Sequence, residues 1–363
     1  MRFLRTALPL VAVATFGLTV LAGVTTAGQN LGWDYQAYAS AGNLTLDGAP
    51  LYDPAADVAG PRGTYLYPPQ FAIAVVPFAL LPAEVGLWLW TALMIVSFVA
   101  AIAIMPVDRS VRWSMLLLGA LAWPVIYTFR LGQVGPLLLL LLAMGWRWLD
   151  RPIVLGLTMA AGAMIKVQPL LHILWAGLVG RWRAVAIACI VIVVTGAVAT
   201  IVFGPDVWSD YAMLLGRVSS PVTTPHNFTP GGLALQRGVS EDVASVIQVT
   251  SILIILATTL VAISTTSSEV SYLTTATASQ LLSPVLWDHY ALVLLLPVAW
   301  LLQRRQWWAV AIPLLMSIPA ILILPSMIYL VLFEIGLFGP IVVDLMDQRT
   351  PRGQGSSVQA GIT

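Results

Sequence analysis

The sequence predicts an all-α polytopic membrane protein, and three observations support that fold class. Of the 363 residues, 59% are hydrophobic and only 9% are charged, whereas soluble globular proteins carry about 25% charged residues. The mean hydropathy is +0.90. Apolar runs of roughly 20 residues, the length that crosses a bilayer, recur along the chain. These figures exclude a soluble enzyme, a nucleic-acid-binding protein and a disordered chain.

The apolar runs predict about twelve membrane-spanning helices, with both termini on the cytoplasmic side. Several runs are shorter than the roughly 17 residues that a simple crossing needs. They are therefore either broken helices around a cavity or spans whose ends are poorly placed by the pattern. The single cysteine, Cys189, excludes an intrachain disulfide. The expected spans are 7–27, 84–105, 113–129, 134–146, 152–165, 167–179, 184–203, 243–263, 272–286, 290–302, 307–324 and 325–343.

Arginine pairs on alternate turns set the predicted orientation, because basic residues accumulate in cytoplasmic loops. The chain has 16 arginines and one lysine, Lys166. Only one turn predicted to be cytoplasmic, 264–271, lacks a pair. The pairs are Arg2 and Arg5, Arg109 and Arg112, Arg147 and Arg151, Arg181 and Arg183, Arg304 and Arg305, and Arg349 and Arg352.

Two segments affect this orientation. The apolar stretch Pro68 to Pro82 has 15 residues and contains Pro77. If it crossed the membrane, every later arginine pair would face outward, so we expect a juxtamembrane or re-entrant helix on the outer face. Residues 1–27 resemble either a signal peptide or a first span. We expect an uncleaved span, because the apolar run is longer than a signal peptide usually has.

Long loops occur only on the predicted outer face. We expect one transmembrane domain, residues 1–347, with a first outer loop at 28–83 and a second at 204–243. The polar tail, residues 348–363, is expected to be disordered and cytoplasmic. Because the inner face has little room for a catalytic domain, an enzyme of this kind works at the outer face.

The absence of familiar sequence motifs narrows the chemistry. The sequence has no Walker A loop, dinucleotide-binding glycine motif, HExxH or paired CxxC, and no Asp-x-Asp pair. ATP and nucleotide sugars are not normally supplied outside the cell. The energy for an outer-face reaction therefore has to arrive in a membrane-borne substrate, such as a lipid-linked, phosphate-activated group.

Asp34 follows the first expected span, between the aromatic residues Trp33 and Tyr35. It is either an ordinary loop or capping residue or a general base at the membrane surface. Lys166 interrupts an apolar run and either extends to the interface or binds a phosphate. Arg130 occupies another short outer turn, and together the two cations would hold a phosphate or pyrophosphate.

Other polar residues in apolar surroundings are functional candidates, because a buried charge is costly in a membrane. Asp288 and His289, at an outer turn, either form a structural pair or orient a sugar hydroxyl or phosphate. The ordinary interpretations are loop polarity for His226 and structural roles for His172 and Glu334, with a lipid-headgroup contact as the alternative for Glu334. The loop candidates for acceptor binding are His226, Asn227 and Arg62.

Six short motifs follow one another along the chain. They are Asp34–Tyr38, Asp47–Tyr52, Tyr65–Phe71, Leu131–Val134, Lys166–Pro169 and the stretch from Ser283 to His289. No single motif is specific, but in this order they resemble those of glycosyltransferase family 87, whose members are polytopic enzymes of the GT-C superfold. The resemblance covers about residues 1–343. Two positions depart from the family pattern: Val167 replaces a common proline, and Tyr290 replaces a common second histidine.

The resemblance implies a GT-C fold and an inverting transfer of a sugar, typically mannose, from a polyprenyl phosphate to a glycolipid or glycan. The linkage is commonly α-1,2. Asp34 would be the catalytic base, without a cofactor or metal. The implied site faces outward in the bacterial plasma membrane. Contacts to the donor phosphate or sugar would come from Lys166, Arg130, His289, Asp288, Gln133 and Tyr67.

Two other functions fit parts of the pattern. A transporter or flippase for a lipid-linked or anionic substrate would also have short, proline-broken helices and lone buried charges. Against it, the chain shows no inverted repeat, and its long loops share one face. A non-catalytic subunit of an envelope assembly is the third possibility. We expect the bilayer, a polyprenyl-phosphate sugar and a glycolipid or glycan as partners, and no nucleic acid.

Overall fold

The computed structural model describes residues 2–53, 64–218 and 227–349, and these residues form helices and no β-strand. The expectation of an all-α protein is therefore confirmed. The helices are α1 (Arg2–Thr25), α2 (Trp33–Asp47), α3 (Pro69–Ala79), α4 (Ala83–Ile104), α5 (Arg109–Leu121), α6 (Trp123–Leu131), α7 (Gly135–Arg147), α8 (Pro152–Ile165), α9 (Leu170–Leu178), α10 (Trp182–Phe203), α11 (Val207–Val218), α12 (Pro230–Gln236), α13 (Glu241–Thr265), α14 (Ser268–Leu281), α15 (Leu295–Gln303), α16 (Ala311–Leu315), α17 (Ile318–Ile321) and α18 (Ile328–Arg349), with 3₁₀ helices η1 (Gly28–Asn30), η2 (Asp288–Leu294) and η3 (Trp307–Val310).

Five helices in the described part of the chain are long and apolar enough to cross a membrane. At a rise of 1.5 Å per residue, a helix of about 20 residues matches a hydrocarbon core of about 30 Å. Only 11% of the α10 segment is buried within the protein, so its apolar side chains face outward, as lipid contact requires. The candidate spans are Ala7–Thr25, Ala83–Ile104, Trp182–Phe203, Glu241–Thr265 and Ile328–Arg349.

The other expected spans correspond to shorter helices. The run 113–129 is divided between α5 and α6, and the run 307–324 between η3, α16 and α17. The helices α7, α8 and α9 contain 13, 14 and 9 residues, which correspond to only about 14–21 Å. Twelve separate crossings therefore stay a prediction.

Two of these helix breaks pair with each other. Ala122 has an extended backbone between α5 and α6, and it forms an isolated bridge with Ser317, between α16 and α17. The Trp123 N–H donates to the Met316 carbonyl at 2.8 Å. Backbone polar groups within an apolar layer need internal partners. Backbone groups left unpaired at one helix break are therefore partly paired with those at the other break.

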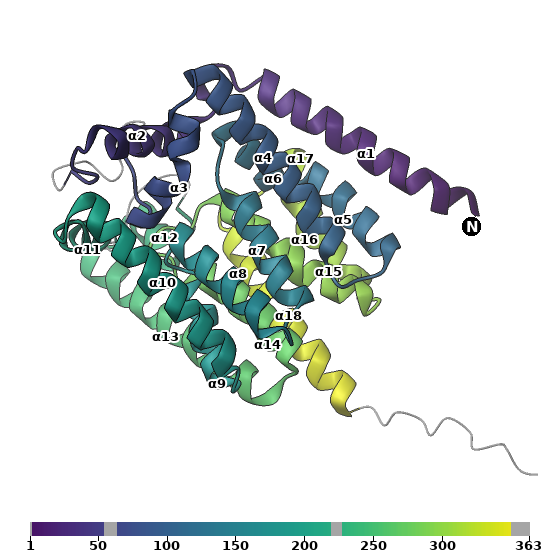
Figure 1. The fold of residues 1–363 in the computed structure, drawn as a ribbon. Coiled ribbons are helices and arrows are strands. Elements are labelled where there is room, and N and C mark those ends of the chain that lie inside the picture. The colour runs from purple at the N-terminus through teal and green to yellow at the C-terminus, as the bar shows by residue number, and fades with distance from the viewer. Residues whose placement is uncertain (1, 54–63, 219–226, 350–363) are drawn as a thin grey trace, which may run out of the picture.

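The first helix packs into the helical body. It lies against α5 and α6, and Phe16 stacks on Phe98 of α4 with ring centroids 5.3 Å apart. In Figure 1, α1 forms one edge of the molecule. That this helix is an uncleaved span rather than a cleaved signal peptide stays a prediction.

The stretch Pro68 to Pro82 contains α3, an 11-residue helix that spans only about 16 Å. It packs along α2, where Gly42 has no room for a side chain against Ala79 and Val75. This short helix agrees with the expected juxtamembrane element. In Figure 1, α2, α3 and α11 lie at one end of the molecule, and the N-terminal end of α1 and the C-terminal end of α18 point away from it.

Helix α14 is largely buried, although it is polar in composition. Every residue from Val270 to Leu281 is buried. Four of its hydroxyl groups donate to backbone carbonyls of the same helix, as in the bond from Thr275 Oγ1 to the Ser271 carbonyl at 2.7 Å; they belong to Ser271, Thr275, Thr277 and Ser279. Small residues with internally satisfied hydroxyls allow close helix packing where all faces are covered.

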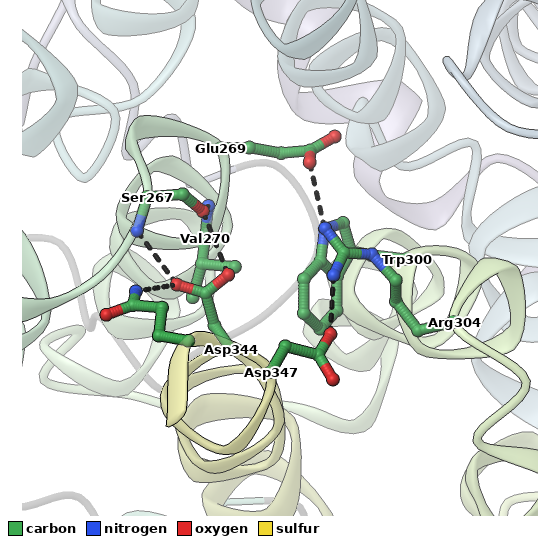
Figure 2. Close-up of polar contacts among 8 residues, drawn as sticks. Ser267, Glu269, Val270, Trp300, Arg304, Asp344 and Asp347 are labelled. Carbon is green, nitrogen blue, oxygen red and sulfur yellow. Dashed lines mark hydrogen bonds and ion pairs between the residues drawn. The ribbon is translucent and has the colours of Figure 1, made fainter. Parts of the chain in front are cut away.

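Polar side chains hold α18 to α14 and α15 (Figure 2). The Asp344 carboxylate accepts hydrogen bonds from the Ser267 N–H at 2.9 Å and the Ser267 hydroxyl at 3.3 Å. Asp347 forms a 2.6 Å ion pair with Arg304. The α18 helix continues through Gln348 and Arg349, which were expected in the tail, and residues 350–363 lie outside the described residues.

Candidate active site

Asp34 lies in the first turn of α2 and is held there by α6. Gly32, the residue immediately before α2, has a left-handed backbone with φ of 71°, and its N–H donates to the Arg130 carbonyl at 2.8 Å. This bond joins the start of α2 to the end of α6, so two segments about 100 residues apart in sequence meet at Asp34.

The turn after α6 places Gln133 beside Asp34. Gly132 follows the last residue of α6 and caps the helix. Its φ of 64° is left-handed, a conformation that glycine adopts without strain. A Cβ at Gly132 would lie 3.0 Å from the Cβ of Tyr35. The Trp90 indole N–H donates to the Gly132 carbonyl at 2.7 Å and fixes the turn.

Four side chains form a hydrogen-bonded network at this turn. Gln133 Nε2 donates to Asp34 Oδ2 at 2.9 Å and to the Tyr67 hydroxyl at 3.1 Å. The Tyr38 hydroxyl donates to Gln133 Oε1 at 3.2 Å and lies 2.8 Å from the Tyr67 hydroxyl. Three of these residues, Tyr38, Tyr67 and Gln133, are buried. The network fixes one carboxylate oxygen of Asp34.

Lys166 supplies a buried cation at the same site. It lies between α8 and α9 in an extended conformation and is 8% exposed. Its ammonium lies 4.2 Å from the ring centroid of Tyr290 and 5.6 Å from that of Tyr67, so two aromatic faces partly compensate its charge. Among the described residues, no hydrogen-bond acceptor contacts this ammonium.

Asp34 and Lys166 act on each other electrostatically without forming a direct ion pair. Burial raises the pKa of Asp34 to about 6, opposed by the Lys166 charge and the Gln133 hydrogen bond. Burial lowers the pKa of Lys166 to about 8, opposed by the Asp34 charge. Both groups therefore titrate near neutral pH, which suits a proton acceptor and an anion-binding cation.

Asp288 and His289 begin η2, and both side chains are buried. Asp288 Oδ2 accepts a hydrogen bond from the Trp123 indole N–H at 2.9 Å, and Oδ1 accepts one from the His289 backbone N–H at 2.9 Å. His289 Nδ1 lies 3.8 Å from Asp288 Oδ1. Arg130 lies over the Trp123 ring at 5.6 Å, so one tryptophan connects Arg130 with Asp288.

Tyr290 joins the two groups of candidate residues. Its ring lies beneath the Lys166 ammonium and edge-to-face with His289, at a centroid distance of 4.9 Å. The residue that departs from the family pattern thus provides the aromatic face for the buried cation. The structure brings the expected Asp34, Gln133, Tyr67 and Lys166 into one cluster, with His289 adjacent through Tyr290.

The loop candidates have other surroundings. Asn227 is fully buried, and its Oδ1 accepts hydrogen bonds from the backbone N–H groups of Thr229 and Leu286, both at 3.1 Å. It joins the second outer loop to the stretch that leads to Asp288, so its contacts are structural, and acceptor binding stays a prediction. Arg62 and His226 lie outside the described residues.

Sequence reasoning missed several aromatic members of the site. Tyr38 lies four residues after Asp34, a spacing that places both on one face of a helix, so that signal was available. No comparable signal marked Trp123 or Tyr127. Tyr127 stacks on Trp123 at 5.1 Å and lies 6.2 Å from His289. Among the described residues, no group of three His, Cys, Asp or Glu side chains is arranged to hold a metal ion.

Comparison with known proteins identifies the family. The model of glycosyltransferase family 87 matches residues 65–287, more than half of the chain. The matched region includes Tyr67, Gln133 and Lys166, whereas Asp34 and His289 lie outside it. No curated protein and no solved structure matches the chain. The chain therefore belongs to glycosyltransferase family 87.

Proposed function

We propose that this membrane glycosyltransferase transfers mannose from a polyprenyl-phosphate donor to a glycolipid or glycan acceptor. In this proposal the site faces outward in a bacterial plasma membrane. The observation that carries it is the pairing of a fixed carboxylate, Asp34, with a buried ammonium, Lys166, in one cluster. An attack on a phosphate-activated sugar needs both charges, one for the incoming hydroxyl and one for the leaving phosphate.

Asp34 acts as the general base. Its Oδ2 is occupied by Gln133, and no hydrogen-bond donor among the described residues contacts Oδ1. Oδ1 is therefore the oxygen that receives the proton of the acceptor hydroxyl. As that proton moves, the acceptor oxygen forms a bond to the anomeric carbon of the sugar from the face opposite the phosphate.

Lys166 stabilises the leaving group. The bond between the anomeric carbon and the phosphate oxygen breaks, and polyprenyl phosphate departs with the electron pair. Negative charge on this phosphate increases in the transition state, so a fixed, poorly hydrated ammonium lowers the barrier. The Lys166 ammonium makes no hydrogen bond within the described part of the chain, which leaves its three donors for phosphate oxygens.

His289 and Arg130 extend the site. His289 shares Tyr290 with Lys166, and Arg130 shares Trp123 with Asp288. We assign His289 and Asp288 to the sugar or phosphate of the donor and Arg130 to its phosphate. Tyr67, whose ring faces Lys166, forms part of the wall of the donor site.

The test compares donor classes on purified protein in nanodiscs. Radiolabelled polyprenyl-phosphate mannose and a radiolabelled nucleotide mannose are each supplied with a membrane glycolipid extract. We expect labelled glycolipid from the polyprenyl-phosphate donor alone. Product from the nucleotide sugar alone would overturn the proposed donor. Movement of labelled lipid across the bilayer without a new glycosidic bond would favour a flippase.

A further inference from the structure

The structure assigns Gln133 a role in positioning the Asp34 carboxylate rather than in binding the donor. This inference rests on the proposed function, in which Asp34 is the base, and it changes the role expected for Gln133 from its sequence motif.

The Gln133 amide has little hydrogen-bonding capacity left for a ligand. A glutamine side chain has two N–H donors and one carbonyl oxygen. One donor goes to Asp34 Oδ2, the other goes to the Tyr67 hydroxyl, and the carbonyl oxygen accepts from the Tyr38 hydroxyl. The residue is 1% exposed. A donor sugar or phosphate would have to break one of these bonds to reach it.

The backbone at Gln133 is anchored independently of any substrate. Its N–H donates to the Thr128 carbonyl at 3.0 Å, and the preceding Gly132 carbonyl is held by Trp90. The two tyrosine hydroxyls, which lie 2.8 Å apart, fix the amide from the opposite side. The Gln133 amide therefore presents an N–H to Asp34 in a fixed direction before substrate binds.

This arrangement gives the two carboxylate oxygens of Asp34 different roles. The bond from Gln133 restrains rotation of the carboxylate about its own axis and leaves Oδ1 for the acceptor. It also favours the ionised carboxylate, because a donated hydrogen bond stabilises negative charge. Loss of the bond therefore affects both the orientation and the protonation of the base.

The other groups that act electrostatically with Asp34 do not mask this effect. Tyrosine hydroxyls stay protonated near neutral pH, and Lys166 loses its proton at higher pH than Asp34. A carboxyl-specific measurement therefore distinguishes Asp34 from these lysine and tyrosine groups. The groups are Lys166 from the α8–α9 junction, Tyr38 from α2, Tyr67 before α3, Tyr127 from α6 and Tyr290 from η2.

The experiment follows the Asp34 carboxyl by infrared difference spectroscopy during a pH titration of the purified protein, with Asp34→Asn identifying the band. We expect Gln133→Met to raise the midpoint by about one pH unit, as when a carboxylate loses a hydrogen bond to its charged form. Gln133→Leu also removes the donor and is expected to raise the midpoint as well. Gln36→Met is the matched control, because Gln36 is an exposed glutamine on α2, the helix that carries Asp34. It should leave the midpoint of the Asp34 titration unchanged.

An unchanged midpoint in both Gln133 variants would overturn the inference. The titration needs no substrate, so it remains decisive if the donor class is wrong. Kinetics provide the second measurement. If Gln133 positions Asp34, its substitution lowers kcat and shifts the acidic limb of the pH profile, and donor binding is kept. If Gln133 binds the donor, its substitution weakens donor binding at least tenfold and leaves the acidic limb in place.

Discussion

At the scale of single residues, the proposed mechanism depends on two charged groups whose pKa values are shifted in opposite directions. Asp34 must be ionised to accept a proton, and its pKa is raised to about 6. Lys166 must be protonated to bind phosphate, and its pKa is lowered to about 8. Both requirements are met only in the interval between these values.

The first prediction is therefore a bell-shaped pH dependence of kcat/KM. Activity should rise as pH increases through about 6, where Asp34 loses its proton, and fall above about 8, where Lys166 loses its own. Initial rates of sugar transfer across this range test it. A profile that continues to fall as pH increases through 6 would exclude a carboxylate base.

The second prediction concerns Lys166→Met, which keeps the length of the chain and removes the charge. We expect donor affinity to fall about 10- to 100-fold, the loss of a charge-assisted hydrogen bond to phosphate. The melting temperature should not fall, because the variant no longer buries a charge beside Tyr290. Donor binding and thermal unfolding in nanodiscs give both readouts.

Arg151→Met, an exposed arginine in the turn between α7 and α8, is the matched control for this prediction. If both variants bind donor equally well, Lys166 has no role in phosphate binding. A lower melting temperature for the Lys166 variant alone would instead indicate a structural role for its contacts with the two tyrosines.

The sequence identified Asp34 and Lys166 as candidates because isolated charges in apolar surroundings are costly. It could not place them together, because α2 and the α8–α9 junction are far apart along the chain. The aromatic partners were missed for a related reason. A tyrosine such as Tyr290 is common near membrane interfaces, and only the fold shows that its ring lies beneath an ammonium.

At the scale of elements, a carboxylate on α18 caps the buried helix α14. Asp344 is 5% exposed, and it accepts hydrogen bonds from Ser267 and from Gln348. The third prediction is that Asp344→Ala lowers the free energy of unfolding by about 1–3 kcal/mol, because the variant loses the hydrogen bonds from Ser267 and Gln348 to a buried carboxylate. Thermal unfolding in detergent measures the loss.

Asp347→Ala is the control one turn away on the same helix. Its carboxylate pairs with Arg304 at a half-exposed position, where such pairs contribute at most about 1 kcal/mol. Equal destabilisation by the two substitutions would contradict the distinct capping role of Asp344 (Figure 2).

Element boundaries were predictable where apolar runs had clear ends and not where they were interrupted. The expected 152–165 matches α8, and the stretch Pro68 to Pro82 contains the short α3. The expected span 307–324 is instead divided, with Pro313 and Pro319 in the segment, because proline removes a backbone donor. The polar helix α14 begins four residues before the expected 272, since hydropathy underestimates a buried Ser- and Thr-rich helix.

At the scale of the whole molecule, the arginine pairs predict an orientation in the membrane. Three helices of the two long loops, α2, α3 and α11, gather at one end (Figure 1). The fourth prediction is that this end faces outward. In a Cys189→Ser background, Ser209→Cys should react with an impermeant thiol reagent on intact spheroplasts, and Asp150→Cys only after permeabilisation.

Ser209 in α11 and Asp150 between α7 and α8 are both exposed, so their positions in the membrane, rather than burial, decide the labelling. Replacement of Cys189 is needed because it is exposed on α10. The reverse pattern of labelling would place the candidate site on the cytoplasmic face and exclude an outward-facing reaction.

The central claim is that Asp34 is the base of a sugar transfer from a polyprenyl phosphate. The most direct test is single-turnover transfer from radiolabelled polyprenyl-phosphate mannose to a glycolipid acceptor, with wild type and Asp34→Asn compared at equal donor occupancy. We predict labelled product from wild type, and from the variant a rate lower by at least about a thousandfold with donor binding retained. Equal rates from the two proteins would remove Asp34 from the reaction and contradict the account.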